Sequence, residues 1–165
     1  MRSGIAVPCL FLFVATMASA DVQSGSVGGT TDDDVRAKDA LCSFFEYLST
    51  GHYEDAASLY GGSYWFLHDH FPEVDPTDYP ALWANTCKRG GLQCLEIREI
   101  VGSSALSNGD YRFAVKFSKA NGQLFIRGPC CGADPAESPP DSIFNMDLQE
   151  VEEQFLVVSY PPYVP

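Results

Sequence analysis

The first strong hydrophobic pattern in the chain has the spacing of an amphipathic helix. Four large apolar residues recur three or four positions apart and therefore share one helix face: Leu41, Phe44, Phe45 and Leu48. The acidic run at residues 32–34 would stabilise the positive end of this helix, and Gly51 is a typical stop at its other end. The pattern predicts a helix over residues 32–50.

Two shorter helices are expected before residue 91. The first spans residues 54–60 and ends at the pair Gly61 and Gly62. The second spans residues 79–88, with Leu82 and Trp83 facing inward, and stops at the glycines 90–91. The aromatic segment between these two helices is expected to be a connector.

After residue 91 the apolar period changes to the alternation of strands, most clearly over residues 111–118. Five strands are predicted, over residues 93–106, 110–119, 123–128, 143–149 and 154–160. The dipeptides Asn108-Gly109 and Asn121-Gly122 separate the first three strands and predict type I′ turns. A loop rich in Gly and Pro, residues 128–142, precedes the last two strands.

Helices followed by an antiparallel meander indicate the α+β class, with the N-terminal helices packed in the sheet. One domain over residues 31–165 is expected, since this length leaves no room for a second. The predicted core comprises the following residues: Leu41, Phe44, Phe45, Leu48, Leu59, Trp83, Leu95, Ile97, Phe113, Val115, Phe117, Phe155 and Val157.

The N-terminus has the pattern of an export signal. Arg2 precedes an apolar run over residues 7–17, and small residues at positions 18–20 form a cleavage site for a signal peptidase. This run is too short to span a bilayer of about 30 Å. We expect residues 1–20 to be a signal peptide, residues 21–30 a flexible leader, and the mature protein to be secreted or extracytoplasmic, without a membrane span.

The net charge limits the classes of partner, and the cysteines bear on the redox compartment. Acidic residues outnumber basic ones 22 to 10, for a net charge of -12, and loss of Arg2 would make it -13. Such a polyanion repels phosphate backbones, so nucleic acid is not an expected partner. Without Cys9, five cysteines enter an oxidising compartment.

Disulfides are the favoured use of these cysteines, because no pair has the spacing of a zinc site. Cys87 and Cys94 flank a glycine reversal that brings them within bonding distance, so this pair is predicted. Cys130 and Cys131 join each other or reach Cys42, and Cys42 is otherwise a buried thiol on the first helix. These alternatives remain open.

Two segments resemble a known superfamily. The run FFEYLSTGHYEDAASLYGG, residues 44–62, resembles the opening of nuclear transport factor two-like domains, and QFLVVSYPPYVP, residues 154–165, resembles the close of their exported bacterial members. The resemblance implies a cone: a curved antiparallel sheet wraps the long helix and leaves a pocket at the open end. This superfamily includes ketosteroid isomerases, dehydratases, cyclases and ligand carriers, so the fold alone does not give a function.

The candidate site residues follow the implied pocket. Five residues are expected to line it: Tyr60, Tyr64, Trp65, Trp83 and Arg127. His68 and His70 point the same way if their segment is extended, and with Tyr64 and Asp69 they are the candidates for an acid/base pair. The alternative is a packed connector and a structural use of the aromatic rings. No isomerase motif can be placed on the chain, and no metal or cofactor is expected.

The expected function is therefore binding, either of a small apolar molecule in the pocket or of another protein. The alternative is an isomerase- or dehydratase-like enzyme that uses an acid/base pair in the same pocket. A homodimer formed by packing two sheets is a third possibility, against which the outward charges of Arg112 and Lys116 argue.

Overall fold

The computed structural model describes residues 32–106, 108–129, 134, 136 and 139–164. The chain divides between Thr30 and Thr31, and the described residues belong to the second unit. The predicted signal peptide, the leader, Cys130 and Cys131 lie outside the described residues. Within the described part, no helix combines the length and the hydropathy that crossing a membrane requires.

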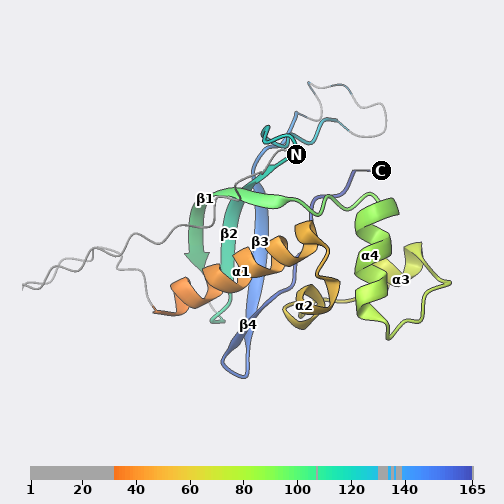
Figure 1. Ribbon diagram of the computed structural model, residues 1–165. Helices are drawn as coiled ribbons and strands as arrows, with labels where there is room; N and C mark the ends of the chain where they lie inside the picture. Colours follow the sequence, from red (N-terminus) through yellow and green to blue (C-terminus); the bar gives the residue numbers. More distant parts are fainter. Residues whose placement is uncertain (1–31, 107, 130–133, 135, 137–138, 165) are drawn as a thin grey trace, which may run out of the picture. The chain divides into compact units, whose positions relative to one another are not determined.

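Within the described residues, four helices precede four strands (Figure 1). The helices are α1 (Asp32–Thr50), α2 (Tyr53–Ser58), α3 (Trp65–His70) and α4 (Tyr79–Arg89). The strands are β1 (Glu96–Ala105), β2 (Tyr111–Ser118), β3 (Phe144–Val151) and β4 (Gln154–Val157). The α+β class is thus confirmed, and α1 and α4 match their predicted ranges to within a residue.

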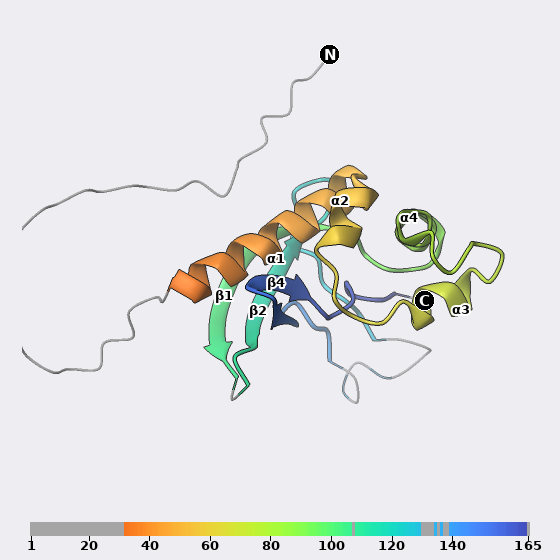
Figure 2. The ribbon, with the colours of Figure 1, turned by 90° about the horizontal axis from the view of Figure 1, so that it is seen from below.

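The strands form one antiparallel sheet in the order β1-β2-β3-β4. The long helix α1 crosses one face of this sheet and contacts β1, β2 and β4, as Figures 1 and 2 show. Helix α2 packs against both α1 and α4, and α3 packs against α4. The short helices therefore form a group of their own beside the end of α1.

The strand predicted at residues 123–128 is wrong. Only two isolated bridges form there, Ser118 with Leu124 and Arg127 with Asp141. The neighbour of β2 along the rest of its length is β3, whose Phe144 lies opposite Val115. The chain therefore leaves the edge of β2 after its hairpin turn and returns to the same edge at β3, which gives four strands where five were expected.

The predicted type I′ turns are also wrong. At the second turn Gly122 has a φ of 78°, but Asn121 is not among the residues with positive φ, and a type I′ turn requires both. The amide of Gly122 donates to the carbonyl of Lys119 at 2.8 Å. The turn at Asn108-Gly109 has the same bonds, so both are three-residue loops that end in a left-handed glycine.

The turn between β3 and β4 has the left-handed conformation at two glutamates instead. Glu152 and Glu153 have φ values of 51° and 66° and lie between the paired residues Val151 and Gln154. Residues with a Cβ rarely adopt this region. Arg36 of α1 donates to the carbonyl oxygen of Glu153 and so holds the turn in place.

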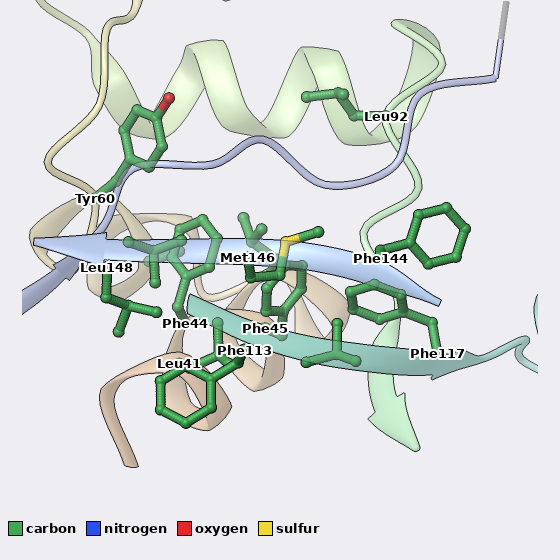
Figure 3. Close-up of a cluster of buried hydrophobic side chains, with 14 of the residues drawn as sticks. Leu41, Phe44, Phe45, Tyr60, Leu92, Phe113, Phe117, Phe144, Met146 and Leu148 are labelled. Carbon is green, nitrogen blue, oxygen red and sulfur yellow. The ribbon is translucent and has the colours of Figure 1, made fainter. Parts of the chain in front are cut away.

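The hydrophobic core lies between α1, the inner face of the sheet and α4, and Figure 3 shows part of it. The ring centroid of Phe45 lies 4.8 Å from that of Phe117, and the ring centroid of Phe44 lies 5.6 Å from that of Trp83. Ten of the predicted core residues are buried, and the other three, Leu59, Leu95 and Ile97, are half-buried against that core.

Strand β1 contains two register shifts, and the first of them lets Ile97 and Ile100 face the core. The pairing with β2 shifts between Ile97 and Glu99 and again between Ile100 and Gly102. Ile97 and Ile100 are three positions apart, a spacing that a regular strand would send to opposite faces. The first shift inserts one extra residue between them, so both isoleucines pack against the core.

The outer face of the sheet is charged. Arg112 pairs with Asp147 at 2.6 Å, and Lys116 pairs with Glu99 at 3.0 Å. These cross-strand pairs occupy the positions that a dry sheet-to-sheet interface would need. The outward orientation that the alternation of β2 predicts for Arg112 and Lys116 is therefore present.

The predicted disulfide between Cys87 and Cys94 is confirmed, with a Cα–Cα distance of 5.5 Å. It ties the last turn of α4 to the residues that lead into β1. Cys42 lies half-buried on α1. The pairings considered for Cys130 and Cys131 stay predictions.

Candidate functional site

Three of the residues expected to line a pocket come together, but they pack against one another. We call this group, completed by two neighbours, the aromatic cluster: Phe44, Tyr60, Tyr64, Trp83 and Tyr160. The ring centroid of Tyr60 lies 5.0 Å from Trp83, 5.1 Å from Tyr64 and 5.8 Å from Tyr160. Rings at these distances are in direct contact, so no ligand fits between them.

The hydroxyl groups of the aromatic cluster are used within the fold. Tyr60 and Tyr160 both donate to the carbonyl oxygen of Ser63, the former at 3.2 Å. The indole nitrogen of Trp83 donates to the hydroxyl of Tyr64 at 3.3 Å. These bonds satisfy the polar ends of large rings that are buried for their apolar area.

Burial also makes these phenols weaker acids. It raises the pKa of Tyr60 well above its ordinary value, and the neighbouring Tyr160 adds to the effect. Burial raises the pKa of Tyr64 to about 12, although the hydrogen bond from Trp83 opposes the change. An efficient acid or base has a pKa near the working pH, so both shifts lead away from catalysis at neutral pH.

The histidine segment is helical, whereas a connector was expected and an extended segment was the condition for His68 and His70 to point the same way. Residues 65–70 form α3, in which positions two apart diverge by about 200° around the axis. His68 and His70 therefore point to different sides. The Nδ1 atom of His70 lies 2.9 Å from the carbonyl oxygen of Phe66, and its ring lies 6.1 Å from that of Tyr163. No group of three metal-ligating side chains occurs among the described residues.

The remaining candidates lie apart from the aromatic cluster. Trp65 is 70% exposed, and Asp69 is exposed on the same helix. Arg127 pairs with Asp141 at 2.6 Å, and its guanidinium lies 5.4 Å from the ring centre of Phe144. Arg127 thus holds the base of the loop between β2 and β3.

A groove lies on the surface between the start of α2 and the first half of α4. Its volume is about 460 Å³, and it is open to solvent. Eight residues line this α2–α4 groove: Gly51, His52, Tyr53, Glu54, Asp55, Pro80, Ala81 and Ala84. One wall is a turn and the first residues of α2, and the other wall is a single face of α4.

Local structure explains how the groove forms. Gly51 has a φ of 83° and ends α1 with a sharp reversal, in which the amide of His52 donates to the carbonyl of Tyr47 at 2.8 Å. The chain then enters α2 directly, and α2 packs on α4. On α4 the small residues Ala81 and Ala84 share a face, and they leave the space that larger side chains would fill.

The α2 side of the groove carries two acidic residues, which we call its rim, and the α4 side is apolar. Glu54 and Asp55 are exposed, and no cation pairs with either one in the described part of the chain. The ammonium group of Lys88 lies 5.6 Å from the ring centre of Tyr53. The ring of Tyr53 therefore already accepts a cation on its face.

Sequence reasoning did not find this groove. Its residues carry weak signals, since small side chains on a helix and the residues of a turn occur in most proteins. Comparison with protein-family models, curated proteins and solved structures gives no match. The resemblance to nuclear transport factor two-like domains, including the cone shape, therefore stays a prediction.

Proposed function

We propose that the protein is an exported binding module that holds a cationic, amphipathic segment of another protein in the α2–α4 groove. The single observation that carries the proposal is this groove, with its apolar α4 side and an acidic rim that makes no ion pair within the described residues. Export is supported by the signal pattern of residues 1–20 and by a disulfide of the kind that persists in oxidising compartments.

The form of the groove favours a protein segment over a small molecule. Sites for small molecules enclose most of the ligand surface, whereas this groove is open along its length. The rings expected to line an enclosed pocket contact one another instead. A protein segment can lie in an open groove and bury one apolar face against Pro80, Ala81 and Ala84.

Charge determines the chemistry of the partner. The partner's apolar side chains would contact the alanine face of α4, and its Lys or Arg side chains would lie beside Glu54 and Asp55. The ring of Tyr53 already carries the ammonium group of Lys88, so the partner's cations would pair with the two carboxylates and not with this ring. The net charge of -12 would speed the approach of a cationic partner.

The alternative of an isomerase- or dehydratase-like enzyme gains no support from the geometry. The hydroxyl of Tyr64 is bonded to Trp83, and its pKa is raised to about 12. His68 and His70 diverge around α3. No specific observation therefore favours an acid/base pair among these residues.

The experiment is a titration of the isotope-labelled protein with a designed amphipathic peptide of Leu, Ala and Lys, followed by NMR. We expect shifts concentrated at Tyr53, Ala81 and Ala84. The substitution Ala84→Arg fills the groove and adds a positive charge that repels the Lys side chains of the peptide, so it should abolish binding. A peptide with Glu in place of Lys should not bind.

A matched pair of variants tests the role of the rim. Glu54→Gln with Asp55→Asn removes two adjacent exposed carboxylates and should weaken binding about three- to tenfold. Glu152→Gln with Glu153→Gln removes two adjacent carboxylates from the turn between β3 and β4, away from the groove. If both double variants weaken binding equally, the loss comes from the change in net charge alone, and the proposed site is wrong.

A further inference from the structure

The C-terminal residues 159–164, which we call the tail, are anchored on the loop between α4 and β1. The amide of Gln93 donates to the carbonyl of Pro162 at 2.7 Å, and the amide of Val164 donates to the carbonyl of Gly91 at 2.9 Å. Leu92 and Tyr163 form an antiparallel bridge. The tail is therefore paired with this loop by two main-chain hydrogen bonds and one isolated bridge.

The loop that receives the tail is closed by the disulfide. Gly91 and Gln93 both lie between Cys87 and Cys94, whose Cα atoms are 5.5 Å apart. Gly91 has a φ of 80°, and a side chain there would clash with the carbonyl oxygen of Val164. The main chain of the closed loop thus lies in close contact with the main chain of the tail.

The tail covers aromatic surface. Pro161 and Pro162 are buried, and the ring of Tyr163 lies 5.8 Å from that of Phe66 on α3. Tyr160 lies 5.2 Å from Phe66 and 6.5 Å from Trp83. In Figures 1 and 2 the end of the chain lies near α3 and α4. Removing the tail would take Tyr160 out of the aromatic cluster and expose one side of Phe66 and of Trp83.

We propose that the Cys87–Cys94 disulfide gates the docking of the tail. With the bond closed, the loop presents the amide of Gln93 and the carbonyl of Gly91 to the tail. With the bond open, the loop is no longer fixed to α4, the tail is released, and the aromatic side of α3 is available to a partner. This device is independent of the α2–α4 groove.

The chemical step is exchange with a dithiol reductant. One thiolate of the reductant attacks a sulfur of the disulfide and forms a mixed disulfide, which releases the other cysteine as a thiolate. The second thiol of the reductant then displaces the remaining cysteine. Two electrons and two protons pass to Cys87 and Cys94, and the reductant leaves as its own disulfide.

Hydrogen exchange of the full chain, with and without dithiothreitol, tests the gate. After reduction we expect the amides of Gln93 and Val164 to exchange at least about tenfold faster, while amides of β2 keep their protection. A variant with Cys87→Ser and Cys94→Ser should show the fast pattern without reductant, which separates this bond from other thiols. Unchanged exchange at Gln93 and Val164 after complete reduction would overturn the proposal.

A second variant releases the tail without touching the disulfide. Gly91→Ala introduces the clash with Val164, so the amides of Gln93 and Val164 should both exchange quickly in the oxidised protein. Gly122→Ala is the control, because Gly122 has a similar φ of 78° and nothing within 4 Å of the added atom. An equal rise in exchange throughout β2 in the reduced protein would show general destabilisation and would also overturn the gate.

Discussion

The turn between β3 and β4 stores backbone strain that a double substitution should relieve. Glu152 and Glu153 have φ values of 51° and 66°, in the left-handed region, where a Cβ approaches the following carbonyl oxygen. Asn and Gly are the residues that this two-residue turn favours. The variant with Glu152→Asn and Glu153→Gly should therefore be more stable than the native protein.

The expected magnitude follows from the two positions. Left-handed backbone costs roughly 1–2 kcal/mol for each residue that has a Cβ. Glycine at 153 removes this cost but adds roughly 0.5–1 kcal/mol of entropy to the unfolded chain, and asparagine at 152 relieves part of the rest. The contact from Arg36 survives, since it reaches the main-chain carbonyl of residue 153. A net gain of about 1–2 kcal/mol remains.

Thermal and urea unfolding measure this gain. For a domain of this size, we expect the melting temperature to rise by about 3–8 °C. The control is Glu152→Gln with Glu153→Gln, which removes the same two charges but keeps both side chains beyond Cβ. If the control is stabilised as much as the Asn-Gly variant, charge repulsion explains the gain and the strain argument is wrong.

Three further predictions concern the core, the buried phenols and export. Phe45→Ala and Phe113→Ala should each cost about 3–5 kcal/mol in urea unfolding, because both side chains are buried; a loss below about 1 kcal/mol would contradict the packing. The contribution of Tyr60 and Tyr64 to stability should be constant below about pH 10 and fall towards pH 12, since both phenols ionise at a lower pH in the unfolded chain; Tyr64→Phe should reduce the fall, and an unchanged profile would refute it. N-terminal sequencing of exported protein should start at Asp21, whereas an intact N-terminus would refute cleavage.

The elements with strong local signals could be predicted from the sequence. The helix α1 combines a long apolar stripe with a glycine stop, and α4 has the capping carboxylate of Asp78, which accepts from the amide of Ala81 at 3.0 Å. The strand β2 alternates without interruption. In these segments the local pattern and the tertiary contacts agree.

The helix α3 could not be predicted in this way. Its six residues, Trp65–His70, are too few to show a period, and a helix this short is stabilised mainly by packing. Leu67 is buried, and Phe66 contacts Tyr160 and Tyr163 from the far end of the chain. Tertiary contacts also explain why the strand predicted at 123–128 does not form. Pairing with β2 at this edge is made by β3 instead.

The candidate site was missed for a related reason. Sequence reasoning selects aromatic and titratable residues, and here Tyr60, Tyr64 and Trp83 serve the packing of the fold. The α2–α4 groove depends on how two helices pack against each other. The residues Ala81 and Ala84 do not by themselves indicate a binding site.

The place of β4 in the core has a consequence for when the protein can fold. Phe155 and Val157 are buried, Val157 bridges to Tyr60, and α1 contacts β4 directly. The core around α1, the first helix of the described residues, is therefore completed only by β4, their last strand. A chain that threads through a translocation channel N-terminus first cannot close this core before its last strand has passed.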